Sequence, residues 1–247
     1  MAIKTILNYS PNFNVKKRNF KQVKFIIFHY TGMKNESEEI NRLTKIQSEV
    51  SCHYFIKNNG EIITMVPECY IAWHAGKSLW GSYKSLNKNS IGIEITNPGH
   101  EFNYKNFTKK QITSLLKLSK YLIKKYKINP KHILGHSDVA PERKKDPGEK
   151  FPWKYLSQNK VGLWHTVNKQ ELLKNRTIKT TKVDKEFFFN NLFKIGYAKK
   201  KLKNVSKEKY LKCILKAFQR RYRQSLVDGK LDQECLLISQ RLIEKFY

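Results

Sequence analysis

The chain has 247 residues, of which 40% are hydrophobic and 13% aromatic, so it can bury a core and global disorder is excluded. No stretch approaches 18 uninterrupted apolar residues, which excludes a membrane-spanning helix. Lysine and arginine number 49 against 20 aspartates and glutamates, giving a formal net charge of +29. Such a charge favours polyanionic partners, but the excess is spread over both halves of the chain and does not identify the partner.

The cysteines and the N-terminus bear on the compartment. The four cysteines lie far apart and form no CxxC pair, which argues against a zinc ribbon or a thioredoxin-type site. Their apolar surroundings predict small core residues. The first twenty residues lack the long apolar region and small-residue cleavage site of a secretory signal. We therefore expect a cytoplasmic protein, with the cell envelope, reached by an unconventional export route, as the alternative.

Strands and helices alternate over residues 1–166, which predicts an α/β domain. Asn58-Asn59-Gly60 predicts a hairpin turn between two alternating segments. Thr108 and Gln111 have the spacing of a capping box, so a helix is expected to begin after Thr108. Apolar or alternating runs predict strands at residues 23–29, 53–57, 61–66, 91–96 and 133–134. A loop punctuated by glycine and proline, residues 135–148, follows the last strand.

The character of the sequence changes after residue 166. Residues 167–183 are polar and rich in lysine and threonine, which predicts a linker. Helical periodicity then predicts three helices at residues 184–195, 206–223 and 232–246, with Asp232 as the cap of the third. We therefore expect an α/β domain at residues 1–166 and an independent three-helix bundle at residues 184–247.

The polar residues that carry chemical information are two histidines and two carboxylates. His29 ends a buried strand, and His136 opens the 135–148 loop. Asp146 lies ten residues after His136 in the same loop. Two imidazoles and one carboxylate from separate segments are the ligand set of an open catalytic zinc site. Glu94 interrupts an otherwise apolar strand, where a carboxylate is costly unless it is paired or lies at a cleft.

Five ordered motifs within residues 20–165 resemble one protein family. They read FIIFHYT, SCHYFI, AWHAG, IGIEITN and GHSDVAPERKKDPG. Together they are similar to the zinc-dependent N-acetylmuramoyl-L-alanine amidases, the type 2 amidases, which include the anhydromuramyl-peptide amidases of cell-wall recycling. The C-terminal segments LFKIGY, AFQRRYR and VDGKLD resemble the small peptidoglycan-binding domain. The resemblance implies a mixed central β-sheet flanked by helices, a fold shared with peptidoglycan recognition proteins, plus a C-terminal three-helix bundle.

The resemblance also implies roles for individual residues. His29, His136 and Asp146 would bind Zn²⁺. Glu94 would act as general base or orient the attacking water, and Lys144 would stabilise the oxyanion. The scissile amide would join the lactyl group of N-acetylmuramic acid, or of its 1,6-anhydro form, to L-alanine. Weaker expectations of substrate contact fall on Trp73, His74, Asn97 and His53.

Simpler interpretations stay open for several of these residues. A histidine on an apolar strand is often a hydrogen-bonded core residue, and for His53 this role is as acceptable as a substrate contact. Glu94 is alternatively a buried ion-pair partner. Lys144 is alternatively a solvated loop residue, and its neighbour Lys145 carries the same charge.

The sequence thus predicts a zinc amidase that acts on peptidoglycan or muramyl-peptide fragments. A module that recognises peptidoglycan without cutting it is the first alternative, although all three expected zinc ligands are present. A nucleic-acid binder is the second, but no helix-turn-helix, zinc-finger or RRM signature supports it. Oligomeric state, and the choice between intact sacculus and soluble fragments, stay open.

Overall fold

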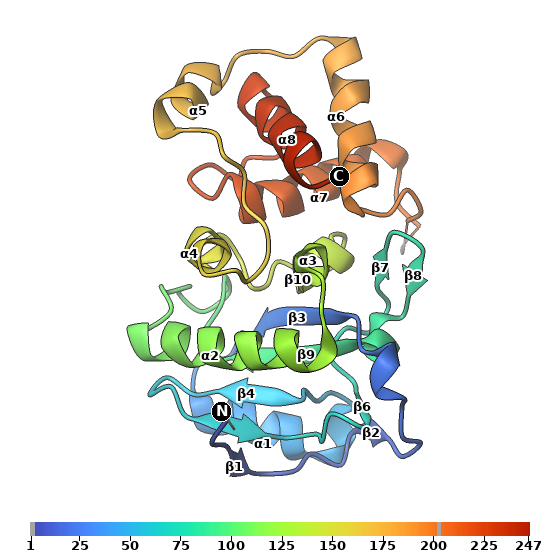
Figure 1. Ribbon diagram of the computed structural model, residues 1–247, viewed down its shortest axis with the longest axis vertical. Coiled ribbons are helices and arrows are strands. Elements are labelled where there is room, and N and C mark those ends of the chain that lie inside the picture. The colour runs from blue at the N-terminus through green and yellow to red at the C-terminus, as the bar shows by residue number, and fades with distance from the viewer. Residues whose placement is uncertain (1–2, 202–203) are drawn as a thin grey trace.

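The computed structural model describes residues 3–201 and 204–247, and its centre is a six-stranded mixed β-sheet (Figure 1). The strand order is β1-β5-β4-β9-β3-β10. Only the β4–β5 hairpin pairs antiparallel among these neighbours, and the other four pairs run parallel. The strands are β1 (Ile6–Leu7), β3 (Phe25–Tyr30), β4 (Tyr54–Ile56), β5 (Ile62–Thr64), β9 (Ser90–Ile95) and β10 (Ile133–Gly135). The predicted mixed sheet is confirmed.

Two central strands set the position of the polar residues. β3 and β9 are apolar along most of their length and run parallel, with His29 directly opposite Glu94. Gly135 of β10 lies opposite Phe28 of β3, so the chain leaves β10 beside His29. Directly opposed residues of neighbouring strands point to the same face of a sheet. The register therefore brings three chemically active segments to one end of the sheet.

Helices and smaller elements surround this sheet. α2 begins at the predicted capping box, in which Thr108 and Gln111 bond each other's backbone amides, and it lies across one face of the sheet (Figure 1). α3 and α4 lie between the β10 edge and the C-terminal helices. The helices of this half are α1 (Glu36–Thr44), α2 (Lys109–Tyr126), α3 (His136–Val139) and α4 (Trp153–Gln158), with 3₁₀ turns at Phe20–Gln22, Ile46–Ser48, Leu86–Asn89 and Pro130–His132. Two small ribbons pair β2 (Phe13–Asn14) with β6 (Ile71–Ala72), and β7 (Leu79–Trp80) with β8 (Tyr83–Lys84).

The C-terminal helices lie close to their predicted positions. They are α6 (Lys182–Ile195), α7 (Lys207–Tyr222) and α8 (Gln233–Phe246), and Asp232 caps α8 as expected. The segment predicted as a linker contains a further helix, α5 (Lys169–Asn175), which contacts α8. Arg176, just after α5, forms a bidentate ion pair with buried Glu234 at 2.6 and 2.7 Å. Residues 167–183 are thus held against the bundle.

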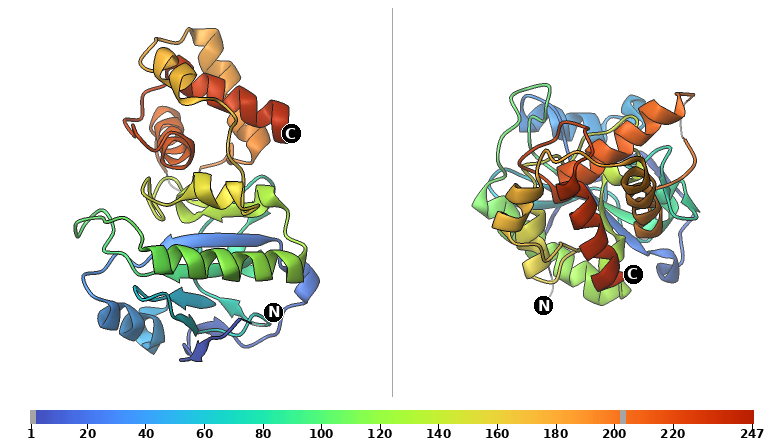
Figure 2. Two further views of the ribbon diagram at one scale, coloured as in Figure 1. Left: turned by 60° about the vertical axis from the view of Figure 1, so that its left-hand side comes forward. Right: turned by 90° about the horizontal axis from the view of Figure 1, so that it is seen from above.

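The bundle packs on the β10 end of the sheet domain, as two further views show (Figure 2). One apolar cluster contains Phe25 and Leu134 of the sheet together with bundle residues such as Phe188, Phe218 and Ile238. Because this core is continuous, the expectation that the bundle is independent of the first domain is not met in the structure. The domain boundaries themselves stay a prediction.

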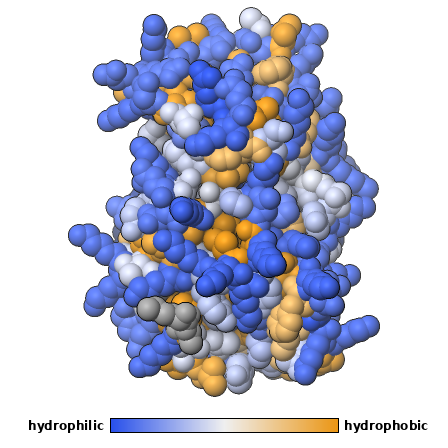
Figure 3. Space-filling view, in the orientation of Figure 1, coloured by the Kyte–Doolittle hydropathy of each residue, from blue (hydrophilic) through white to orange (hydrophobic). Residues whose placement is uncertain are grey.

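Charged and polar residues dominate the face of the molecule shown in Figure 3, with hydrophobic residues in small groups between them. In the described part of the chain, no helix combines the length and apolar character needed to cross a membrane. All four cysteines are free. Cys52 and Cys235 are buried as expected of core residues, whereas Cys69 and Cys213 are only partly buried.

His165, which lies between α4 and α5, should make the fold sensitive to acid. It is 7% exposed, and burial lowers the pKa of its imidazole from 6.5 to about 4. A lowered histidine pKa means that the fold favours the neutral form, so its contribution is complete above pH 6.5 and is lost as the pH falls towards 4. The full loss is roughly 3 kcal/mol.

We expect His165→Phe, which keeps a ring beside Trp164, to flatten the fall of unfolding free energy between pH 6.5 and pH 4. Urea unfolding at several pH values measures this slope for both proteins. Identical slopes for the wild type and the variant would show that other groups cause the acid sensitivity.

Candidate active site

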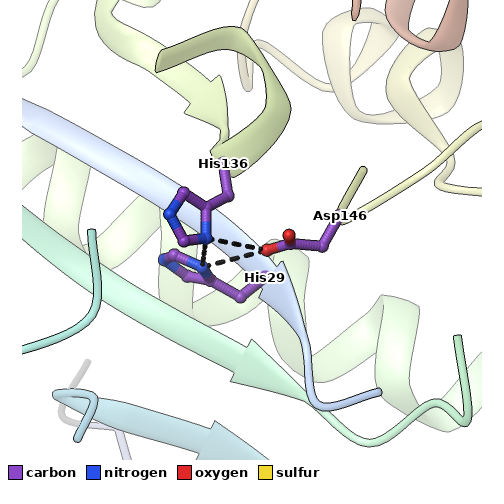
Figure 4. A group of neighbouring side chains, drawn as sticks. All are labelled: His29, His136 and Asp146. Carbon is purple, nitrogen blue, oxygen red and sulfur yellow. Dashed lines mark hydrogen bonds and ion pairs between the residues drawn. The ribbon is translucent and has the colours of Figure 1, made fainter. Parts of the chain in front are cut away.

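Three predicted ligands converge at the end of the sheet (Figure 4). His29 comes from β3, His136 is the first residue of α3 directly after β10, and Asp146 lies in the loop that follows. The two Nδ1 atoms are 2.9 Å apart, and each lies 3.1 Å from Asp146 Oδ2. All three side chains are buried.

The hydrogen bonds behind His29 fix its tautomer. Its Nε2 lies 3.0 Å from His74 Nδ1, and His74 Nε2 lies 3.0 Å from Ser90 Oγ. Ser90 donates its own proton to the carbonyl of Leu86 at 2.6 Å, so its oxygen accepts from His74. The chain of donors is complete only when His29 carries its proton on Nε2. Nδ1 of His29 therefore presents a free lone pair.

His136 is oriented in the same sense. Its Nε2 lies 3.2 Å from the carbonyl oxygen of Ala75, which accepts only from an N–H. Arg143 Nη2 is 3.3 Å from the same nitrogen, but its two protons go to the carbonyls of Ala75 and Lys77. Nδ1 of His136 is then unprotonated and faces His29 and Asp146. Burial lowers the pKa of His136 to about 4 and lowers the pKa of His29 as well, so both rings favour the neutral form.

The arrangement consequently gathers three lone-pair atoms with no proton between them. These atoms repel one another unless a cation lies among them. Tetrahedral zinc with bonds of about 2.05 Å places its ligand atoms about 3.3 Å apart. The observed separations of 2.9–3.1 Å fall within a few tenths of an ångström of that spacing. Nitrogen and carboxylate donors that are buried and anchored from behind fit a divalent metal of this kind.

Glu94 lies beside this cluster. Its Oε1 is 3.9 Å from His29 Nδ1, while within the described residues its buried Oε2 has no hydrogen-bond partner. Burial raises the pKa of Glu94 well above its ordinary value, and the negative charge of Asp146 adds to this. A buried carboxylate oxygen without a partner is costly, which indicates a group kept for a ligand or a reaction.

A cavity of about 380 Å³ opens in front of these groups. Lys144 and Lys145 both line it, but Lys144 is half-buried whereas Lys145 is exposed. The charge of Lys144 acts on Glu94, lowering a pKa that burial raises. The cavity is lined by Tyr30, Thr31, Gly32, Met33, Glu39, Arg42, Leu43, Val50, Ser51, Trp73, His74, Glu94, Pro98, His100, Glu101, His136, Arg143, Lys144, Lys145 and Asp146.

The four expected substrate contacts divide into two groups. Trp73 and His74 line the cavity, and contact with substrate stays a prediction for them. His53 is fully buried and accepts the backbone N–H of Gly92 at 3.0 Å. Asn97 is 3% exposed and donates to the carbonyl of Lys105 at 2.9 Å. The placement of His53 and Asn97 favours structural roles and gives no support to a substrate contact.

Several residues at the cavity were not singled out from the sequence. Arg143 holds two loops together, because its guanidinium donates to the carbonyls of Ala75 and Lys77. Glu39 is 1% exposed, and burial raises its pKa to about 7. It lies four residues before buried Leu43 and so on the apolar face of α1. This position in the sequence could have predicted that Glu39 is buried.

A polar chain at the cavity was also missed. Tyr30 Oη lies 2.8 Å from His100 Nδ1, and His100 Nε2 lies 3.0 Å from Glu149. Tyr30 directly follows the predicted ligand His29, whereas His100 and Glu149 lie in segments without a recognisable pattern. Only the fold brings these three side chains together.

Comparison with known proteins supports the resemblance to the amidases. Residues 19–149 match the N-acetylmuramoyl-L-alanine amidase family. The N-acetylmuramoyl-L-alanine amidase AmiD of Escherichia coli is 32% identical over 239 residues, which are 92% of this chain and 84% of that protein. The 1,6-anhydro-N-acetylmuramyl-L-alanine amidase AmpD of Haemophilus influenzae is 40% identical over 116 residues, 46% of this chain and 61% of that protein.

Solved structures show the same relationship. E. coli AmiD, in complex with the substrate anhydro-N-acetylmuramic acid-L-Ala-D-gamma-Glu-L-Lys, matches with a TM-score of 0.79 at 32% identity, covering 91% of this chain and 90% of that chain. AmpDh3 of Pseudomonas aeruginosa, in complex with anhydromuramic pentapeptide, matches with a TM-score of 0.77 at 29% identity, covering 100% and 98%. Fold and site together define a hydrolase of linear amides with a His-His-Asp cluster that could hold a metal ion. The chain belongs to the N-acetylmuramoyl-L-alanine amidase family.

The contact between His29 and His74 can be tested through metal affinity. His74→Leu leaves the Nε2–H of His29 buried without an acceptor, so we expect zinc affinity to fall about 10–100-fold. His74→Gln should recover part of the loss, because its amide can both accept from His29 and donate to Ser90. Competition with a chromophoric chelator measures the zinc Kd. An unchanged Kd with a raised KM would instead assign His74 to substrate binding.

Proposed function

We propose that this protein is a zinc-dependent amidase that cleaves the amide between N-acetylmuramic acid, or its 1,6-anhydro form, and L-alanine. The observation that carries the proposal is the cluster of three unprotonated ligand atoms on His29, His136 and Asp146. Glu94 lies beside it on the neighbouring strand, in a cavity open to a ligand. A module that only recognises peptidoglycan has no need for this combination of metal ligands and a buried carboxylate.

Zinc held by these residues would polarise the scissile carbonyl and lower the pKa of its water from 15.7 to about 7. Glu94 would accept a proton from the attacking water and deliver it to the leaving amine. A cation at the ligand cluster favours the ionised form of Glu94 and so opposes the effect of its burial. Lys144, half-buried at the same cavity, would hold the oxyanion that forms on the carbonyl oxygen.

The charges around the cavity fit a muramyl peptide. Four cationic side chains, from Arg42, Arg143, Lys144 and Lys145, line it. The lining also holds four carboxyl groups, of Glu39, Glu94, Glu101 and Asp146. The stem peptide carries carboxylates, which the cationic groups would attract. The relatives described above include enzymes named for the 1,6-anhydro substrate and structures that contain anhydromuramyl peptides. A role in cell-wall degradation or recycling follows, with peptidoglycan binding by the C-terminal bundle as a further prediction.

Removal of the metal should abolish hydrolysis. After treatment with a chelator we expect loss of amidase activity, and added zinc should restore it. His136→Ala should fail to hold zinc, since two remaining protein ligands bind it weakly. Mass spectrometry of products from sacculi and from anhydromuropeptides shows which amide is cut and which substrate is preferred. Full activity in a metal-free preparation would contradict the zinc assignment.

The two residues beyond the metal can be separated by kinetics. Glu94→Gln should retain zinc yet lower kcat by about 10²–10⁴. Lys144→Ala should lower kcat by about 10²–10³ with little change in KM. Lys145→Ala is the matched control, because it removes the neighbouring charge from the same cavity wall and should leave kcat nearly unchanged. A larger effect at Lys145 than at Lys144 would transfer the oxyanion role.

A further inference from the structure

Asp138, two residues after the ligand His136, is the most heavily bonded carboxylate near the site. Its Oδ2 accepts the backbone N–H of Gly135 at 2.8 Å, which ends β10 and begins α3. The same oxygen accepts from Arg221 Nη1 at 2.6 Å, and Oδ1 accepts the hydroxyl proton of Tyr197 at 2.7 Å. Arg221 and Tyr197 both belong to the C-terminal part of the chain.

Arg221 reaches further into the sheet domain. Its Nη2 donates to the carbonyl of Ile133 at 2.8 Å, at the outer edge of strand β10. Its guanidinium lies 4.4 Å from the ring centroid of Trp153, a residue that in turn packs against Phe28. Arg221 thus contacts the beginning of β10, the carboxylate after its end, and the packing next to His29.

A small displacement of the backbone at these contacts would move the predicted metal ligands. Ile133 and Asp138 lie on either side of His136 in the sequence, and Gly135 is paired with Phe28, the residue before His29. The Asp138 and Arg221 side chains are 1% and 3% exposed, so neither charge can turn to water if its partner is lost. A buried ion pair adds little to stability compared with apolar residues of the same size. The Asp138–Arg221 pair instead fixes geometry, because the two side chains take part in four directed hydrogen bonds.

We propose that Arg221 and Tyr197 of the C-terminal bundle are positioning residues, which hold the His136 ligand in place through Asp138. The inference depends on the function proposed above, because it concerns the same metal site. It assigns to the C-terminal bundle a part in building the catalytic centre, in addition to any contact with the cell wall. Removal of residues 184–247 should then impair hydrolysis even of small soluble substrates.

The test uses Arg221→Met in the full-length chain, with Arg223→Met as a matched control. Arg223 lies two residues after Arg221, at the end of α7, and its side chain is also fully buried. It pairs with Asp232 and with Asp228, both within the bundle. Each variant therefore removes one buried cation from the C-terminal bundle, but only Arg221→Met breaks a contact with the His136 segment.

We expect Arg221→Met to weaken zinc affinity about 10-fold, measured by competition with a chromophoric chelator, and to lower kcat at saturating zinc. Arg223→Met should lower the melting temperature while leaving the zinc Kd close to that of the wild type. Asp138→Asn combined with Arg221→Met should lose no more affinity than the larger single effect, because both changes break the same contact.

Tyr197→Phe keeps the test decisive if Arg221→Met does not fold. It removes one hydroxyl donor and should weaken zinc affinity about 3-fold. The inference is overturned if Tyr197→Phe leaves the zinc Kd unchanged, or if folded Arg221→Met and Arg223→Met have the same Kd. A wild-type protein that binds no zinc and cuts no muramyl amide would instead overturn the proposed function. The two failures are therefore distinguishable.

Discussion

The parallel pairing of β3 with both β9 and β10 is the constraint on which the rest of the structure depends. It places His29 opposite Glu94 and brings His136 one residue beyond the end of β10. Parallel strands present their carboxyl ends at the same edge, so residues distant in sequence meet there without a dedicated loop for each. The apolar residues of the three strands are buried and hold the strands in register. The sheet thereby keeps the repelling lone pairs together, although burial strengthens their repulsion.

That cluster also explains why the surrounding groups are so closely bonded. Each imidazole must turn its unprotonated nitrogen inward, and only a partner behind the ring enforces this. His74 and Ser90 do so for His29, and the carbonyl of Ala75 does so for His136. Gly92 leaves room for the ring of His74, because a Cβ at this position would lie 2.3 Å from that ring. A glycine in the interior of a strand is therefore explained by the close approach of a ring that orients a predicted metal ligand.

Five strands of the central sheet, α2 and the three C-terminal helices could be predicted from the sequence because their signals are local: apolar runs, a capping box at Thr108 and the Asp232 cap. The two-residue strands β1, β2, β6, β7 and β8 were not predicted. The two histidines and Asp146 were found because strand ends and a proline-flanked loop mark them. Glu39 was missed although its position on the apolar face of α1 was a local signal. Arg143 and His100 were not found, since their significance comes from neighbours distant in sequence. The docking of the bundle was mistaken for independence for the same reason. A polar segment such as residues 167–183 has the composition of a tether, whereas the contacts of α5 with α8 depend on the assembled fold.

The predicted metal ligands are supported from two different parts of the chain. His29 is backed by residues of the sheet domain alone, through His74, Ser90 and Leu86. The His136 segment begins at an edge strand, where unpaired backbone groups require a cover. Arg221 supplies that cover at Ile133, and Asp138 supplies it at Gly135. An edge strand beside a cluster of predicted metal ligands needs such a partner to fix its residues. At Ile133 the partner comes from the C-terminal bundle, which joins the part that resembles a wall-binding domain to the geometry of the candidate site.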